Sequence, residues 1–133
     1  MSPRALLLTG TLGVGKTTVA AAVGDLLRER EVDLGFSTLV LAGVLETAED
    51  RARHAEAVRV PLTVCRLVAD PESVRRRLHD RHRDDPDGLG WHLRRAGELA
   101  AIQDASAVED LRLDVTALAV VEAASRVLGH RDV

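Results

Sequence analysis

The residues that most constrain this chain lie near its N-terminus, at positions 10–17. There Gly10-Thr11-Leu12-Gly13-Val14-Gly15-Lys16-Thr17 matches the pattern G-x-x-x-x-G-K-[ST]. Glycines at these positions let successive backbone N–H groups point into one concavity that holds phosphate oxygens. An apolar run, residues 5–9, precedes the motif as a predicted buried strand, and residues 16–30 follow it with helical apolar spacing. The motif and its flanks therefore predict a phosphate-binding loop between a strand and a helix.

The chemistry of the motif assigns a ligand to its polar side chains. Lys16 is the only lysine among the 18 Lys and Arg residues, and its compact ammonium differs chemically from a guanidinium. In such a loop the lysine reaches the β- and γ-phosphates, and the hydroxyl that follows it, here Thr17, binds Mg²⁺. We therefore predict a site for ATP and Mg²⁺, with Lys16 as a catalytic residue. The predicted nucleotide contacts come from Gly10, Thr11, Leu12, Gly13, Val14, Gly15, Lys16, Thr17 and Thr18.

The rest of the chain alternates predicted strands and helices. Further strands are predicted at residues 32–34, 38–42, 62–68 and 110–115, and further helices at residues 47–57, 70–81, 91–105 and 118–128. This alternation predicts an α/β fold with a parallel sheet flanked by helices. The length of 133 residues suits one domain, residues 1–133. With aromatics at only 2%, its core must be built from Leu, Val and Ala.

Composition excludes several classes of partner and site. A net charge of −3 gives no electrostatic reason to expect a nucleic acid or an anionic membrane as partner. No apolar run approaches the roughly 20 residues of a membrane span. Cys65 is the single cysteine, which rules out an intrachain disulfide and predicts a small buried residue in a reducing compartment. These features, with ATP as ligand, predict a cytoplasmic monomer or homodimer.

The loop and its flanks, TGTLGVGKTTVA, resemble the P-loop kinases of small molecules, of the adenylylsulfate kinase-like, gluconate kinase-like and adenylate kinase-like kinds. That resemblance implies a five-stranded parallel sheet in the order 2-3-1-4-5. It also implies transfer of the γ-phosphoryl group of ATP to a small acceptor of the adenylylsulfate, sugar-acid or nucleotide kind. It further implies a lid that carries arginines and closes over the nucleotide.

The lid is expected to begin at Arg77-Leu78-His79-Asp80-Arg81, which resembles the R-L-x-x-R of the gluconate kinase-like group. The resemblance implies that Arg77 and Arg81, four residues apart on one helix face, contact the nucleotide or stabilise the transferring phosphoryl group. An exposed basic helix would show the same pattern. The glycine-containing stretch 84–90 would then be the mobile lid.

Further expectations concern residues that follow the lid. Arg94 and Arg95 in the next predicted helix could reach phosphates, or could be ordinary exposed arginines. Trp91 is expected to pack this helix against the sheet edge or the lid. Residues 114–116 resemble the loop that borders adenine in these kinases, and an ordinary strand-to-helix turn is the alternative.

One stretch departs from the family's pattern. Only Gly35, Phe36 and Ser37 separate the predicted strands 32–34 and 38–42, whereas a parallel crossover needs about a dozen residues. The resembling kinases place acceptor-binding helices here, often after a D-x-D pair, of which Asp33 alone remains. We predict Asp33 as a catalytic residue and metal ligand, with Glu46 as the second candidate. Either residues are missing from the sequence at this point, or the protein lacks the acceptor-binding segment.

These patterns predict an ATP-dependent kinase of a small molecule. A nucleotide-binding module without kinase activity is the first alternative, because the acceptor-binding segment is short. A small NTPase without an acceptor is the second, and GTP is disfavoured because the sequence has no N-K-x-D-like motif. His79 and His82 are not expected to bind a metal, because the surrounding arginines repel cations.

Overall fold

A four-stranded parallel sheet forms the centre of the computed structural model, which describes residues 3–31 and 38–131. Its strands are β1 (Arg4–Thr9), β2 (Thr38–Ala42), β3 (Leu62–Val68) and β4 (Leu111–Asp114), and they lie side by side in the order β2-β1-β3-β4. Every pairing is parallel. The predicted bounds of these four strands agree with the observed ones to within about one residue, which is the usual uncertainty at strand ends. The predicted α/β class is confirmed.

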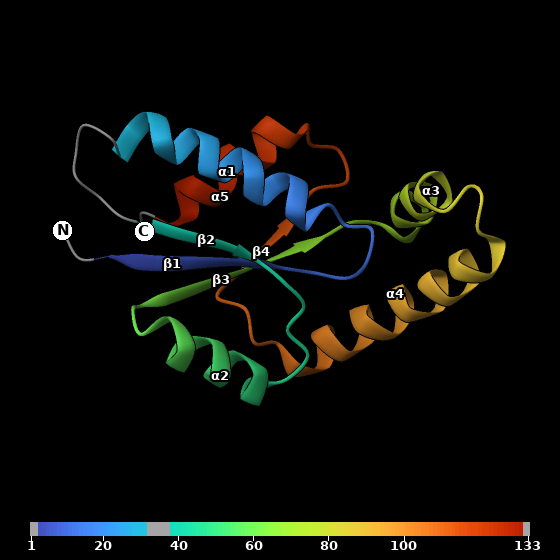
Figure 1. Cartoon of the computed structure of the whole chain (residues 1–133), viewed down its shortest axis with the longest axis horizontal. Helices are drawn as coiled ribbons and strands as arrows, with labels where there is room; N and C mark the ends of the chain where they lie inside the picture. Colours follow the sequence, from blue (N-terminus) through green and yellow to red (C-terminus); the bar gives the residue numbers. More distant parts are fainter. Residues whose placement is uncertain (1–2, 32–37, 132–133) are drawn as a thin grey trace.

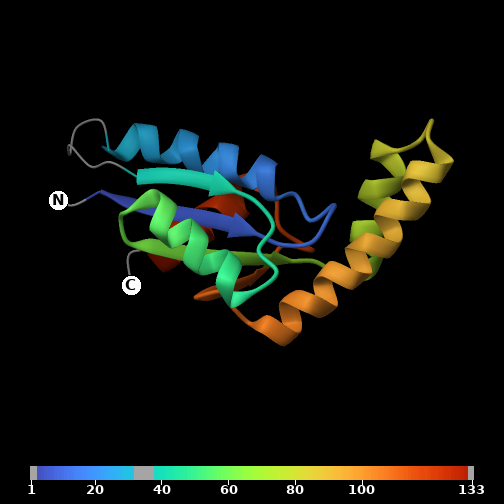
Figure 2. The ribbon, with the colours of Figure 1, turned by 60° about the horizontal axis from the view of Figure 1, so that its bottom comes forward.

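Helices cover both faces of the sheet (Figure 1). Helices α1 (Lys16–Glu31) and α5 (Val120–Arg131) pack side by side on one face. Helix α2 (Ala48–Val58) and the C-terminal part of α4 (Pro86–Ser106) lie on the other. Helix α3 (Pro71–Arg81) pairs with the N-terminal part of α4, and this α3–α4 hairpin projects beyond the carboxyl ends of the strands (Figure 2). Parallel strands joined through covering helices are the arrangement that the sequence predicted.

The core explains why β1 is a continuous apolar run. Leu6 and Leu8 are fully buried against α1 and α5, whereas Leu7 is buried on the opposite face with Leu45 and Val64. Because burial of each such side chain contributes about 1.5–3 kcal/mol, the central strand is firmly held from both faces. The strand that leads into the glycine-rich loop is thus the best anchored strand of the sheet.

The number of strands needs a correction. The described residues form four strands rather than five, in the order expected for a sheet without its outer strand. The predicted strand 32–34 lies outside the described residues. The sequence runs directly from Glu31 to Thr38. Residues 32–37 are the whole connection between α1 and β2, and they are too few for a crossover that contains acceptor-binding helices.

The predicted lid also needs a correction. Residues 84–90 were expected as a loop, but α4 already begins at Pro86. Asp85 caps this helix, because its side chain accepts a hydrogen bond from the Gly88 N–H at 3.1 Å, and proline suits the first helical position. Trp91 is 53% exposed, so the expectation that it packs α4 against the sheet edge or the lid is wrong.

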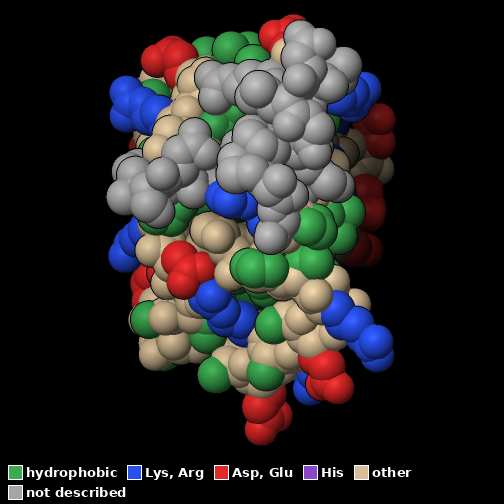
Figure 3. Space-filling view, turned by 90° about the vertical axis from the view of Figure 1, so that its left-hand side faces the viewer, with side chains coloured by type: hydrophobic (Ala, Val, Ile, Leu, Met, Phe, Trp, Pro, Cys, Tyr) green, Lys and Arg blue, Asp and Glu red, His purple; other side chains and the backbone are tan. Residues whose placement is uncertain are grey.

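The end of the molecule at which β1 and β2 begin lies opposite the glycine-rich loop. Where described residues form this face, acidic, basic and apolar side chains are scattered among one another (Figure 3). Within residues 3–31 and 38–131, no helix combines the length and apolar character needed to cross a membrane.

Candidate functional site

The glycine-rich loop follows β1 directly and has the backbone conformation that its sequence predicted. Gly10, Gly13 and Gly15 have φ values of 154°, 79° and 93°, a region that side chains with a Cβ rarely adopt. A Cβ on Gly10 would lie 2.7 Å from the carbonyl oxygen of Leu67 in β3, so this glycine also permits a close backbone approach. These glycines therefore allow the tight turn that connects β1 to the start of α1.

Lys16 is the first residue of α1, where the helix dipole is positive. Its Nζ donates a hydrogen bond to the carbonyl oxygen of Thr11 at 3.4 Å. Burial lowers the pKa of Lys16 below its ordinary value, and the positive charge of Arg81 lowers it further. Two cationic side chains and a helix N-terminus thus converge on one spot, which favours a bound anion. A hollow of about 40 Å³ lies there, lined by Gly13, Gly15, Lys16, Thr17, Thr18 and Arg81.

Arg77 and Arg81, the two arginines of the predicted lid motif, both extend from α3 to the loop, but they lie against it differently. The Arg77 guanidinium donates hydrogen bonds to the carbonyl oxygens of Val14 at 2.6 Å and Gly13 at 3.4 Å. Arg77 therefore holds the loop backbone. Arg81 lies beside Lys16 and borders the anion-sized hollow. Of these two arginines, Arg81 is the one that lines the hollow.

A larger cavity of about 530 Å³ adjoins the loop. Its volume is typical of sites for ligands of nucleoside size. Apolar side chains from α1, from the segment after β4 and from α5 form one wall, and the α3 arginines form the other. The lining residues are Gly13, Val14, Gly15, Thr18, Val19, Arg77, Asp80, Arg81, Val115, Leu118, Val120 and Ala123.

The segment after β4 is fixed firmly at the edge of this cavity. Val115 donates from its N–H to the Val68 carbonyl oxygen at 2.8 Å, and the Asp70 N–H donates to the Thr116 hydroxyl at 2.9 Å. Hydrogen bonds from Thr116 lower the pKa of Asp114. The predicted adenine-bordering loop, residues 114–116, thus does line a cavity next to the phosphate loop, through Val115.

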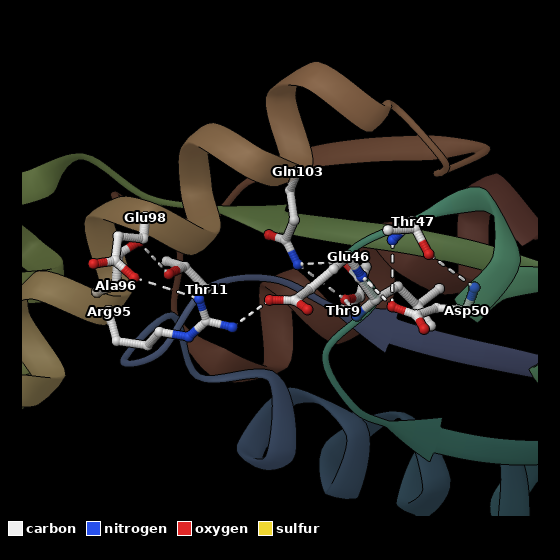
Figure 4. Close-up of polar contacts among 10 residues, drawn as sticks. Thr9, Thr11, Glu46, Thr47, Asp50, Arg95, Ala96, Glu98 and Gln103 are labelled. Atoms are coloured by element: carbon white, nitrogen blue, oxygen red, sulfur yellow. Dashed lines mark hydrogen bonds and ion pairs between the residues drawn. The ribbon is translucent and has the colours of Figure 1, made fainter.

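Helix α4 is attached to the carboxyl end of β1 and to the loop that follows it, which the sequence did not predict. The Thr11 hydroxyl donates to the Ala96 carbonyl oxygen at 2.5 Å. The buried Gln103 amide donates to the Leu45 carbonyl oxygen at 3.1 Å and to the Thr9 hydroxyl at 3.4 Å (Figure 4). The sequence did offer one signal for Gln103: it is a polar residue within a largely apolar stretch of the helix, which is typical of a buried side chain with hydrogen-bond partners.

A second link joins α4 to the segment after β2. The Arg95 guanidinium forms an ion pair with the Glu46 carboxylate, and the two side chains are 31% and 34% exposed. Arg95 also lies 3.4 Å from the Glu98 carboxylate. Figure 4 shows the Arg95 side chain reaching from α4 toward Glu46. Sequence alone could not predict this contact, because its partners lie on separate elements.

The predicted metal ligands are placed only in part. Thr17 is exposed at the start of α1, next to the anion-sized hollow, where its hydroxyl can bind an ion held by phosphates. Asp33 lies outside the described residues. Among residues 3–31 and 38–131, no group of three or more His, Cys, Asp or Glu side chains forms a metal site. His82 stacks on His92, with ring centroids 4.0 Å apart.

Cys65 lies in β3, on the face covered by α1 and α5, and is 1% exposed. Burial, with a smaller contribution from Glu109, raises the pKa of the thiol to about 12. The expectation of a buried core cysteine is confirmed.

Comparison with known proteins gives a fold but no sequence family. No protein-family model and no curated protein sequence matches this chain. A gluconokinase from Sinorhizobium meliloti is 18% identical, with a TM-score of 0.63 over 97% of this chain and 93% of that one. A shikimate kinase from Acinetobacter baumannii, solved with shikimate, is 20% identical, with a TM-score of 0.66 over 96% and 92%.

An adenylylsulfate (APS) kinase from Mycobacterium tuberculosis, solved with AMPPNP and APS, is 22% identical, with a TM-score of 0.53 over 98% of both chains. At these identities the similarity concerns the fold. The chain therefore has the α/β fold of the P-loop small-molecule kinases, as the resemblance of its loop implied.

Proposed function

We propose that this protein is an ATP- and Mg²⁺-dependent phosphotransferase that acts on a small-molecule acceptor. The observation that carries the proposal is the convergence of Lys16, Arg81 and the N-terminus of α1 on an anion-sized hollow beside a cavity of nucleoside size. In this arrangement the adenosine occupies the cavity and the triphosphate extends along the loop toward Lys16. Thr17 and the phosphate oxygens hold Mg²⁺, which offsets the negative charge of the β- and γ-phosphates.

Catalysis of phosphoryl transfer is mainly positioning and charge stabilisation, and the site supplies both. Lys16 and Arg81 stabilise the negative charge on the transferring group, while Arg77 holds the loop in place. The solved structures of similar fold are named for gluconate, shikimate and adenylylsulfate. All three compounds carry both an anionic group and hydroxyls, so we infer an acceptor of this general chemistry.

A turnover assay tests the proposal. ADP formation from Mg·ATP is measured with D-gluconate, shikimate and adenylylsulfate as acceptors, at matched concentrations of wild type and Lys16→Ala. We expect acceptor-stimulated turnover that needs Mg²⁺ and falls by at least about 10²-fold in Lys16→Ala. The exposed arginine substitution Arg28→Met serves as control and should leave turnover unchanged. Full activity in Lys16→Ala would contradict the assignment of the site.

A nucleotide-binding module without acceptor is the second candidate. The observation that favours it is the short connection 32–37, where the resembling kinases hold acceptor-binding helices. This alternative predicts that ATP binds and that none of the acceptors increases ADP formation. Slow ADP formation that no acceptor accelerates would instead indicate a small NTPase.

A further inference from the structure

The geometry of the loop defines the side from which an acceptor must approach, if the proposed function holds. The nucleoside-sized cavity borders the loop at Gly13 to Gly15, whereas the Lys16 ammonium lies against the Thr11 carbonyl. Because the loop lysine reaches the β- and γ-phosphates, the terminal phosphate lies toward Thr11. The acceptor then enters on the Thr11 side, away from the nucleoside.

The Glu46–Arg95 ion pair is placed on that side by contacts to both neighbours. Ala96, next to Arg95, accepts the hydrogen bond of the Thr11 hydroxyl. Leu45, next to Glu46, donates from its N–H to the Thr9 hydroxyl at 3.0 Å. Glu46 therefore follows a residue that is hydrogen-bonded to the end of β1, and Arg95 precedes a residue that is hydrogen-bonded to the start of the loop (Figure 4).

The pair is fixed at its backbone and accessible at its side chains. The Glu46 N–H donates to the Asp50 carboxylate at 3.0 Å, so the capping residues of α2 hold its main chain. Both side chains remain about one-third exposed, at 34% for Glu46 and 31% for Arg95. A partly exposed ion pair adds little to stability because water screens it, so an incoming anion can replace one partner at little cost.

The chemistry of the two groups matches the two needs of an acceptor. A guanidinium binds carboxylate, sulfate or phosphate groups through two parallel hydrogen bonds. A carboxylate within reach of a hydroxyl can accept its proton during attack. Two other carboxylates lie close by, but Asp50 is held by the Glu46 N–H and by Arg53. The Glu98 side chain is 62% exposed. Asp33 lies outside the described residues.

We propose that Arg95 and Glu46 form the acceptor end of the site. Arg95 binds the anionic group of an acceptor that carries an oxyacid group beside a hydroxyl, and this binding releases Glu46. The acceptor oxygen then forms a bond to the γ-phosphorus while the bond from that phosphorus to the β–γ bridging oxygen breaks. The electron pair of the broken bond stays on ADP, and the hydroxyl proton passes to the Glu46 carboxylate.

The test separates this role from a purely structural link between α4 and the segment after β2. Trp91 is the only tryptophan and lies one helical turn before Arg95, so its fluorescence reports ligands near Arg95. Binding of D-gluconate, shikimate and adenylylsulfate is titrated in the presence of Mg²⁺ and AMPPNP. Turnover with each acceptor is measured in parallel on wild type, Arg95→Met, Arg95→Lys and Glu46→Gln.

We expect at least one of these anions to bind wild type with saturation. Arg95→Met should raise its Kd and KM by about tenfold or more, and Arg95→Lys should recover part of the loss. Glu46→Gln should lower kcat by about 10²-fold with little change in Kd, and should remove the acidic limb of the pH–rate profile. Exposed controls, Arg28→Met and Glu56→Gln, should match wild type.

Two outcomes would overturn the proposal. If Arg95→Met and Glu46→Gln lose thermal stability but keep wild-type kcat and KM, the pair is only a structural link. If none of the three anions binds to wild type, the anionic class of acceptor is wrong. Failure of the proposed function would give a different result. The wild-type protein would then not bind AMPPNP, or its rate of ADP formation would be the same in Lys16→Ala.

Discussion

The Arg77 guanidinium donates a hydrogen bond to the Val14 carbonyl oxygen at 2.6 Å, linking α3 to the phosphate loop across 63 positions of sequence. Through this contact the helix that carries Arg81 and the loop that carries Lys16 are held in one arrangement.

Replacement of Arg77 by methionine should weaken nucleotide binding by about tenfold, because the Val14 and Gly13 carbonyl oxygens lose their donor and the loop is less well ordered. Anisotropy of a fluorescent ATP analogue measures this affinity. Arg75→Met, an exposed neighbour on α3, is the matched control and should bind as wild type does. Equal affinity in Arg77→Met and wild type would show that the loop needs no support from α3.

Nucleotide affinity should fall at alkaline pH because of Lys16. Its pKa in the free protein is lowered by burial and by Arg81, and bound phosphates should raise it again. At a pH between the Lys16 pKa of the free protein and that of the nucleotide complex, Lys16 takes up a proton when the nucleotide binds. Nucleotide affinity therefore decreases by up to about tenfold per pH unit as the pH rises through this range. Affinities from neutral pH to about pH 10 test this, since the ordinary lysine pKa is near that value. Lys16→Arg, which stays charged, should show a flatter profile than wild type.

Substitution of Gln103 by leucine should lower the free energy of unfolding by about 1–3 kcal/mol, because the buried Leu45 carbonyl and Thr9 hydroxyl lose a donor. Urea denaturation monitored by circular dichroism measures the change. Ser125→Ala, at an exposed position of α5, should change stability by less than about 0.5 kcal/mol. A stable Gln103→Leu variant would mean that apolar packing of α4 compensates for the lost hydrogen bonds.

Two glycines should respond to alanine in opposite directions. Gly97 lies in α4 with open space where a Cβ would be, so Gly97→Ala should stabilise the protein by about 0.5–1 kcal/mol. Gly10 has a φ of 154° and would place a Cβ 2.7 Å from the Leu67 carbonyl oxygen, so Gly10→Ala should destabilise it by about 1 kcal/mol or more. Urea midpoints of the two variants, compared with wild type, check both signs. A neutral Gly10→Ala would show that the loop relaxes freely.

Local patterns predicted most of the fold because they depend on neighbouring residues. The apolar run Leu62–Val68 and the Asp70-Pro71 cap gave the bounds of β3 and the start of α3. The start of α4 was missed, although Asp85-Pro86 is the same cap signal. There the glycines that follow suggested a loop, and the capping hydrogen bond of Asp85 outweighed them.

The site was predictable only where one motif contains it. The loop from Gly10 to Thr17 specifies its own backbone, so its residues could be named in advance. The contacts of Gln103 and the Glu46–Arg95 ion pair join elements that are far apart in sequence. Local sequence patterns cannot predict such contacts, because they depend on how the elements pack. The exposure of Trp91 likewise depends on where α4 ends up relative to the sheet.

The two walls of the nucleoside-sized cavity differ in how they should exchange amide hydrogens with solvent. The loop leaves the central strand β1, whose neighbours on both sides protect its amides, so these should exchange only when the whole protein unfolds. The α3–α4 hairpin extends beyond the sheet and packs on its own small apolar cluster (Figure 2). Local opening of this hairpin, without disruption of the sheet, would let a nucleotide enter and leave, so its release rate should follow the exchange rate of the hairpin amides.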